Sequence, residues 1–183
     1  LVLKEVGLSA TIVWRHRMYI EIIPNPTKDD VWYIRKQLQE FNLTHLEVTE
    51  DKPFVLFAKD DESGERIGGI SCTIFGQWID IDSLWVREDQ RGKGIGSALL
   101  ERSVERARKA GCTNAWVNTF SFQSPEFYLK HGFEKVFEQA NYPKTSSRTF
   151  LVREIGQHRG DDTVSGNEVV GQPGSIEIRE EKA

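Results

Sequence analysis

The segment RGKGIGS, residues 91–97, carries three glycines at alternate positions, between an apolar run that ends near Val86 and an amphipathic run that begins at Ile95. This pattern predicts a buried strand, a short polar turn and a helix within residues 83–104. Glycines just ahead of a helix leave backbone N–H groups uncovered, and these donors add to the positive end of the helix dipole. The arginine and lysine of the segment add positive charge at the same place. The segment therefore predicts a binding site for phosphate oxygens.

The spacing of these glycines separates several hypotheses about the ligand. A dinucleotide fold requires GxGxxG after its first strand, with an acidic residue roughly 20 positions later. Here the third glycine comes one residue early, and the strand before it follows a predicted antiparallel hairpin. A P-loop requires GxxxxGK[ST], which the chain lacks. A glycine-rich turn that binds no ligand remains the alternative for this segment taken alone.

Length and composition limit the class of protein. At 183 residues the chain is long enough for one domain with a substantial core. The formal net charge of −4 argues against a nucleic-acid partner, which would need a broad basic surface. No apolar run approaches the ~20 residues of a membrane span, and the N-terminal residues lack a signal-peptide pattern. We therefore expect a soluble, cytoplasmic protein with no membrane partner.

Cysteine and histidine spacing predicts no metal site. Cys72 and Cys112 lie in apolar surroundings without CxxC or metal-ligand spacing, and the four histidines form no zinc pattern. Both cysteines are expected to be reduced core residues, which fits a cytosolic compartment better than a secreted one.

The N-terminal part of the chain predicts one strand and one helix. Residues 1–17 precede the only methionine and are interpreted as an N-terminal extension or as added sequence. A first strand is expected over residues 19–23, before two prolines. Thr27 is a suitable N-cap, and an apolar stripe at helical spacing follows it. The stripe consists of Val31, Ile34, Leu38 and Phe41.

The remaining elements lie on both sides of the glycine segment. Strands are predicted over residues 53–58, 66–75, 78–86, 115–119, 133–137 and 148–153. Helices are predicted over residues 95–110 and 124–132, with Ser124 as the cap of the second. The order predicts an α/β fold with a mixed, mostly antiparallel central sheet and helices on both faces. Residues 156–183 are polar and are expected to form a disordered tail.

Two segments, QRGKGIGSALL and further along EFYLKHGFE, carry a recognisable pair of motifs. Arg91, Gly94 and Gly96 match the pattern Q/R-x-x-G-x-G/A, and residues 127–133 match FY-x-x-x-GF. Together these motifs resemble the GNAT superfamily of N-acetyltransferases. The resemblance covers residues 18–155. It implies a domain whose central sheet splays between the strand before the glycines and the strand after the helix.

The resemblance implies acetyl-coenzyme A as co-substrate and assigns its contacts. The backbone of residues 92–97 would hold the pyrophosphate, and the strand edge at residues 84–86 would pair with the pantetheine arm. The residues assigned to this cofactor are Leu84, Trp85, Val86, Arg91, Gly92, Lys93, Gly94, Ile95, Gly96, Ser97, Thr119, Ser121 and Tyr128. Ser121 and Ser124 stand where many members have asparagine and alanine, and Ser121 can still donate a hydrogen bond.

Acetyl transfer to an amine needs a neutral amine, a stabilised oxyanion and a protonated leaving thiolate. Tyr128 matches the family tyrosine near the sulfur, and a phenol with its usual pKa of ~10 is protonated at neutral pH. A backbone N–H near Val86 is the expected oxyanion donor. The alternative for Tyr128 is a half-buried core position on a short helix.

The candidate base lies on the strand before the glycines. Successive side chains of a strand point to opposite faces of the sheet. This alternation places Asp80, Asp82 and Leu84 on one face, and Ile79, Ile81 and Trp85 on the other. Asp82 is nearer the cofactor site and is therefore preferred over Asp80 as the proton acceptor, directly or through water. The alternatives are a water chain alone, or acids that only attract a cationic substrate or face solvent.

The acceptor is expected to be a small molecule with a primary amine. Phe120, Phe122 and Tyr142 are the candidate aromatic wall of its pocket, with a place in the core as their alternative. A protein N-terminus or a lysine is a second acceptor class. A non-catalytic module that binds or senses acyl-coenzyme A is the competing hypothesis, and the presence of Tyr128 favours the enzyme. Oligomeric state stays open, with a homodimer through the late strands as one alternative.

Overall fold

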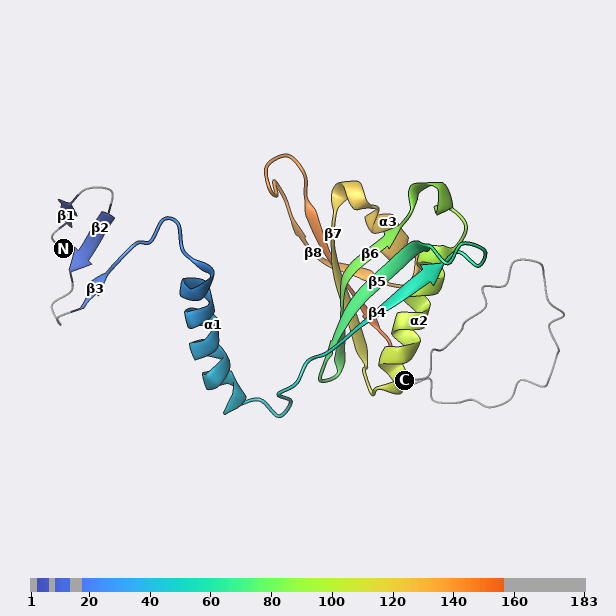
Figure 1. Ribbon diagram of the computed structural model, residues 1–183, viewed down its shortest axis with the longest axis horizontal. Helices are drawn as coiled ribbons and strands as arrows, with labels where there is room; N and C mark the ends of the chain where they lie inside the picture. Colours follow the sequence, from blue (N-terminus) through green and yellow to red (C-terminus); the bar gives the residue numbers. More distant parts are fainter. Residues whose placement is uncertain (1–2, 7–8, 14–17, 157–183) are drawn as a thin grey trace. The chain divides into compact units, whose positions relative to one another are not determined.

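The computed structural model describes residues 3–6, 9–13 and 18–156 of the chain. The chain divides into two compact units between Thr49 and Glu50, and each unit is described by itself (Figure 1). Residues 157–183, which belong to the segment expected to be disordered, lie outside the described residues. None of the helices in the described ranges is long and apolar enough to cross a membrane.

The first unit holds a small antiparallel sheet and helix α1 (Lys28–Leu43). Its strands pair in the order β1 (Leu3–Val6), β2 (Ser9–Val13) and β3 (Tyr19–Ile20). The strand predicted over residues 19–23 is shorter than expected, because its pairing with β2 reaches only Ile20. Helix α1 begins after Thr27 as predicted. The N–H of Asp30 donates to Thr27 Oγ1 over 3.2 Å, and the N–H of Thr27 donates to Asp30 Oδ2 over 2.8 Å, which together form a capping box.

The second unit is built on a six-stranded sheet in the order β4-β5-β6-β7-β9-β8. Its strands are β4 (Lys52–Lys59), β5 (Arg66–Phe75), β6 (Trp78–Val86), β7 (Asn114–Phe120), β8 (Glu134–Gln139) and β9 (Arg148–Glu154). Neighbouring strands are antiparallel except β6 and β7, which run parallel. The predicted antiparallel hairpin before β6 and the mixed, mostly antiparallel α/β sheet are confirmed.

Helix α2 (Ile95–Lys109) packs against β4, β5 and β6 and lies on one face of this sheet (Figure 1). Its buried residues include Leu99, Leu100, Val104 and Ala107, which recur at the spacing of one helix face. Cys72 and Cys112 are buried and free, and both belong to the same core. The apolar stripe of α2 and the alternating residues of β5 and β6 therefore build one continuous core.

Three shorter helical segments belong to the same unit. They are the 3-10 turns Glu88–Gln90 and Ser121–Gln123 and the helix α3 (Pro125–Lys130). Helix α3 has proline at its first position as predicted, but Ser124 does not cap it with its side chain. Ser124 has a left-handed backbone with φ of 78°, whereas a capping serine needs an extended backbone to reach the first N–H groups.

A β-bulge in β6 changes which side chains share a face of the sheet. Ile81 and Ser83 pair with consecutive residues of β5, so Asp82 between them is an extra residue. Ile81 is buried before the bulge, and Leu84 packs against the same core after it, whereas Trp85 is 52% exposed. The expected grouping of Leu84 with the two aspartates, and of Trp85 with the isoleucines, is therefore wrong, because the bulge shifts the alternation by one residue.

The sheet splays between β6 and β7. The two parallel strands pair only over residues 78–81 and 114–117. Beyond these residues β6 continues to Val86 beside β5, and β7 continues to Phe120 beside β9. The edges that the two strands would otherwise present to each other are open there, and open strand edges take up a further strand readily. The splayed sheet is thus confirmed, and the open part of the β6–β7 pair is called the splay below.

We expect Leu100→Ala to lower the free energy of unfolding by about 2–5 kcal/mol, because Leu100 is 0% exposed and its truncation leaves a cavity under α2. Urea denaturation followed by circular dichroism measures the change. Leu129→Ala is the matched control on α3, where the side chain is 39% exposed and the expected loss is within about 0.5–1 kcal/mol. Equal losses in the two variants would contradict the assignment of Leu100 to the core.

Candidate active site

The N-terminus of α2 is open to a ligand. Gly94 is the N-cap residue with φ of 83°, and Gly92 before it has φ of 76°. The helix has no side-chain cap and no acidic residue in its first turn. A Cβ built on either glycine would have no neighbour within 4 Å among the described residues. Uncapped N–H groups, a positive helix end and uncrowded glycines suit an anion, so the predicted phosphate contacts of residues 92–97 fit the local structure.

Gly96 brings the two sequence motifs together. A Cβ at Gly96 would lie 3.5 Å from Cζ of Phe127 and 3.7 Å from Cγ2 of Val86. The first turn of α2 therefore packs directly against the end of β6 and against α3. The glycine of one motif contacts the aromatic residue of the other, which explains why both motifs are needed to build one site.

The two cations of the glycine segment have intramolecular partners. Arg91 Nε donates to the carbonyl oxygen of Val86 over 3.1 Å, which closes the turn between β6 and α2. Lys93 Nζ donates to Oε1 of Gln90 over 3.0 Å. Both side chains thus hold the loop in shape, and their contacts with a cofactor stay a prediction.

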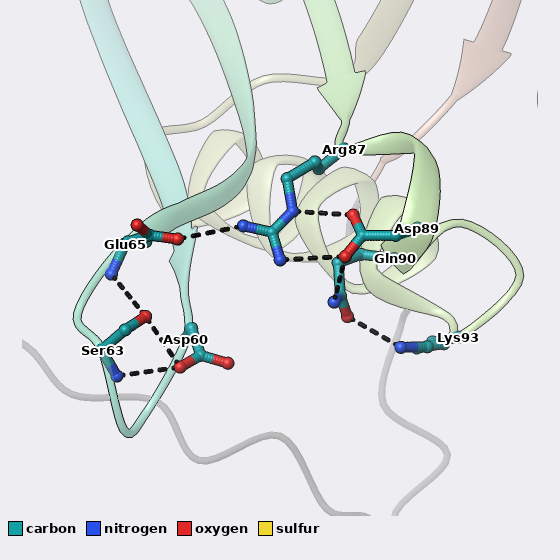
Figure 2. Close-up of polar contacts among 7 residues, drawn as sticks. All are labelled: Asp60, Ser63, Glu65, Arg87, Asp89, Gln90 and Lys93. Carbon is teal, nitrogen blue, oxygen red and sulfur yellow. Dashed lines mark hydrogen bonds and ion pairs between the residues drawn. The ribbon is translucent and has the colours of Figure 1, made fainter.

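Arg87 anchors the loop before α2 to the β4–β5 turn (Figure 2). Its guanidinium donates to Asp89 Oδ1 over 2.7 Å, to Asp89 Oδ2 over 3.0 Å and to Glu65 Oε2 over 3.2 Å. Gln90 Nε2 donates to Asp89 Oδ2 over 3.0 Å and extends the network to Lys93. The hydrogen bonds from Arg87 hold the pKa of Asp89 below its usual value. Sequence reasoning missed Arg87, whose only local signal is its position between β6 and an acidic turn.

The β4–β5 turn is itself held in shape by Asp60 (Figure 2). Its Oδ1 accepts hydrogen bonds from the N–H and the hydroxyl of Ser63, both over 2.9 Å, and these bonds lower the pKa of Asp60. Ser63 Oγ accepts from the N–H of Glu65 over 3.3 Å. Exposed ion pairs add little to the free energy of unfolding. The role of these hydrogen bonds is therefore to position Glu65 opposite Arg87.

An open groove of about 750 Å³ lies on the sheet face opposite α2. Its lining includes Thr73, Asp80, Trp116, Phe137 and Phe150. Thr73, Asp80, Trp116 and Phe150 alternate along their strands with buried core residues, which places them on the face opposite that core. The indole of Trp116 stacks on Phe150 with ring centroids 6.4 Å apart. The groove is therefore mainly apolar, with two carboxylates, Asp51 and Asp80, in its wall.

The two candidate bases differ in environment. Burial and, to a smaller extent, repulsion from Asp82 raise the pKa of Asp80 to about 6, against a hydrogen bond from Trp116 that lowers it. Asp82 lies at the bulge, is exposed, and accepts a hydrogen bond from Thr73 Oγ1 over 3.1 Å. A carboxylate with a pKa near 6 is ionised at neutral pH and still basic enough to take a proton, which suits Asp80 to this chemistry.

Tyr128 is buried, with 7% of its surface exposed. Its ring makes edge-to-face contacts with Phe127 and Phe133 at centroid distances of 5.1 and 5.7 Å. Burial, followed by the neighbouring Cys72 thiol, raises the pKa of Tyr128 to about 12. Tyr128 thus belongs to the core and remains a protonated donor at neutral pH, so the two interpretations of this residue are compatible.

The predicted aromatic wall comes together at the end of β7. Phe120 stacks on Phe122 at 5.1 Å and on Tyr142 at 5.9 Å between ring centroids. Arg148 lies against this group, with Cζ 5.1 Å from the Phe120 ring centre and 4.4 Å from that of Tyr142. Sequence reasoning missed Arg148, because nothing in the first residues of a late strand signals contacts with two distant aromatic residues.

Thr119 and Ser121 have local partners. Thr119 is 4% exposed, and its hydroxyl donates to Oε1 of Gln123 over 3.4 Å. The N–H of Ser121 donates to the carbonyl oxygen of Ser147 over 2.9 Å, and its Oγ accepts from the N–H of Ser147 over 3.3 Å. Ser121 thus ties the end of β7 to the β8–β9 loop, and its predicted cofactor contact stays a prediction.

Several known proteins are similar to this chain in sequence and in fold. A blasticidin-S acetyltransferase of Streptomyces morookaense is 35% identical over 116 residues, which cover 62% of this chain and 85% of the relative. An acetyltransferase from Bacillus cereus ATCC 14579, known from its crystal structure, is 32% identical with a TM-score of 0.67, covering 73% of this chain and 96% of the other. A Bacillus anthracis acetyltransferase solved in complex with acetyl coenzyme A shares the fold at 16% identity and a TM-score of 0.50, covering 56% of this chain and 62% of the other.

The family assignment follows from these matches together with the geometry of the loop and the splay. The model of the acetyltransferase (GNAT) family matches residues 14–133, which is more than half of the chain. The chain therefore belongs to the acetyltransferase (GNAT) family and is an acyltransferase.

Proposed function

We propose that the protein transfers the acetyl group of acetyl-coenzyme A to an amine of a small molecule. The observation that carries this proposal is the meeting of the uncapped N-terminus of α2 with the splay, through the contact of Gly96 with Val86 and Phe127. Acetyl-coenzyme A supplies the acetyl group, whose carbon gains a bond to the amine nitrogen as its bond to sulfur breaks. The solved relative that contains acetyl coenzyme A supports this choice of donor.

The backbone of the loop and of β6 would hold the donor. The N–H groups of residues 92–97 lie at the uncapped N-terminus of α2 and suit pyrophosphate oxygens. The strand edge at residues 84–86 faces the splay and suits the amides of the pantetheine arm, as in strand addition. A backbone N–H near Val86 would stabilise the negative charge that develops on the acetyl oxygen.

Two side chains would move the protons. Tyr128 would protonate the leaving thiolate, since a phenol with a pKa near 12 carries its proton at neutral pH. Asp80 would take the proton that the amine loses, directly or through water, because its pKa near 6 leaves it ionised at neutral pH. The sequence-based preference for Asp82 is thus replaced in this proposal by Asp80, with Asp82 as the alternative base.

The acceptor class rests on the relatives and on the groove. The names of the Streptomyces relative and of several others describe acetyltransferases of small molecules, which supports a small acceptor. The apolar groove beside Asp80 is a further support. Protein N-termini or lysines are the second acceptor class, and an acyl-coenzyme A sensor is the competing function.

Acetyl-coenzyme A at about 100 times its Kd is expected to raise the free energy of unfolding by ~2.7 kcal/mol, and thiol release should follow when a panel of amines is added. Thermal unfolding and a thiol-reactive dye measure the two effects. If acetyl-coenzyme A does not stabilise the protein, the proposal is wrong. If it stabilises the protein but no acceptor leads to thiol release, the protein is an acyl-coenzyme A sensor.

Gly94→Ala is expected to weaken acetyl-coenzyme A binding about 10–100-fold, because alanine strains the left-handed turn and misaligns the N–H donors. Gly111→Ala is the matched control. Gly111 follows the other end of α2, also has positive φ, and also has open space around its Cβ position. Both variants should lose about 1–2 kcal/mol of stability, and only Gly94→Ala should lose affinity. Equal affinities in isothermal titration would contradict the loop assignment.

Tyr128→Phe is expected to lower kcat by about 10²–10⁴-fold and to leave the affinity for acetyl-coenzyme A nearly unchanged, because the ring still packs but no proton is donated. Steady-state kinetics and cofactor titration separate the two effects. A variant with wild-type kcat and weakened binding would show that Tyr128 shapes the cofactor site and is not the acid.

The pH dependence of kcat/KM tests the base. Asp80 accepts a proton only when ionised, so the rate should rise with pH through an apparent pKa of about 6. Asp80→Asn should remove this rise and lower the plateau, whereas Asp82→Asn should keep the rise. The opposite pattern would restore Asp82 as the base, and an unchanged profile in both variants would leave water as the proton acceptor.

A further inference from the structure

The Arg148 cluster consists of Phe120, Phe122, Tyr142 and Arg148, and its cation has no anionic partner among the residues that the structure describes. The guanidinium of Arg148 contacts the ring faces of Phe120 and Tyr142. Its Nε is buried and has no hydrogen-bond partner among the described residues. Aromatic faces stabilise a guanidinium and fix its plane, but they accept none of its five N–H donors.

Neighbouring carboxylates do not neutralise Arg148 in the part of the chain that the structure describes. Glu138 of β8 pairs in register with Thr149, the residue after Arg148. Its carboxylate is instead bound by Lys135 Nζ at 3.0 Å, and a further hydrogen bond from Ser147 helps to lower its pKa. A partly buried cation without a counter-ion is costly, and an anion that binds there recovers this cost.

The position of the cluster connects it with the proposed reaction. Arg148 pairs in register with Phe120 on β7, three residues beyond Val117, where the β6–β7 pairing ends. At about 3.3 Å per residue this is about 10 Å along the strand. Phe122 is 70% exposed and stacks on Phe120, whose ring also contacts this cation. The cluster therefore lies at the open end of the splay and presents both a charge and an apolar surface.

We propose that Arg148 binds the carboxylate of the acceptor, and that Phe122 contacts an apolar part of the same molecule. The acceptor class is then an amine that also carries a carboxylate and an apolar group, such as an apolar amino acid. A planar guanidinium with a fixed orientation suits bidentate binding of a carboxylate. A polycationic acceptor would be repelled by Arg148. This inference rests on the proposed function and names its acceptor.

Matched pairs of acceptors test the inference. L-phenylalanine and L-phenylalaninamide differ only in the carboxylate, and so do L-leucine and L-leucinamide. The wild-type protein should prefer each acid over its amide by about 10–100-fold in kcat/KM, with the difference mainly in KM. Arg148→Gln should bring this ratio close to one, and Arg148→Lys should restore part of it, because lysine keeps the charge without the bidentate geometry.

Arg66→Gln is the matched control. Arg66 also lies over an aromatic ring, with Cζ 4.0 Å from the centre of Phe57, but it stands at the start of β5. This variant should keep the preference for the acid. Thermal unfolding checks that each variant is folded, and Arg148→Lys remains informative if Arg148→Gln unfolds.

Two failures can be told apart. Titration of L-phenylalanine and of its amide into the wild-type protein and the Arg148 variants reports carboxylate binding even without turnover. Loss of binding to the acid in Arg148→Gln supports the inference even if no acetyl transfer is detected, which would count against the proposed function alone. Transfer to amides or polyamines in preference to acids, or equal acid binding in wild type and Arg148→Gln, would overturn the inference.

Discussion

The close approach of α2 to the end of β6 and to α3 is the constraint on which the rest of the site depends. At Gly96 a Cβ would be in ordinary van der Waals contact, 3.5 Å from Phe127 and 3.7 Å from Val86, so the position has room for no more than a small side chain. A larger side chain would displace the first turn of α2, and its N–H donors with it. Phe127 precedes Tyr128 on α3, so the same contact fixes the candidate acid. The glycine motif and the aromatic motif are therefore halves of one packing arrangement.

The splay depends on a second irregularity, the bulge at Asp82. Pairing with β7 ends at Ile81, and the bulge follows immediately. A bulge increases local twist and re-aims the residues after it. It turns Leu84 into the core beside α2 and Trp85 outward. The end of β6 is thus held by the core and by β5, while its other edge is left open to a ligand.

Local signals made most of the fold predictable. The cap at Thr27 and the glycines ahead of α2 act within a few residues, and the two helices that they predict were confirmed. The face of Leu84 was not predictable, because the bulge depends on how β6 pairs with β5. The contact of Arg87 with Glu65 and that of Arg148 with Phe120 were missed because these partners lie far away in sequence. The aromatic wall was predicted as a group, whereas the charge beside it was not.

Electrostatics along β7 links the choice of acceptor to the proposed base. Asp80 lies beside Trp116 and Arg148 beside Phe120, four residues or about 13 Å apart along the strand. A purely cationic acceptor would be attracted by Asp80 and repelled by Arg148. An anionic acceptor would be attracted by Arg148 and repelled by Asp80. An amino acid carries both charges, so each of its charged groups meets a side chain of opposite charge, which offsets the cost of removing that group from water. Its ammonium must lose a proton before attack, and Asp80 can accept that proton while Arg148 holds the carboxylate. Selection of the acceptor and its deprotonation would then be two consequences of one charge arrangement.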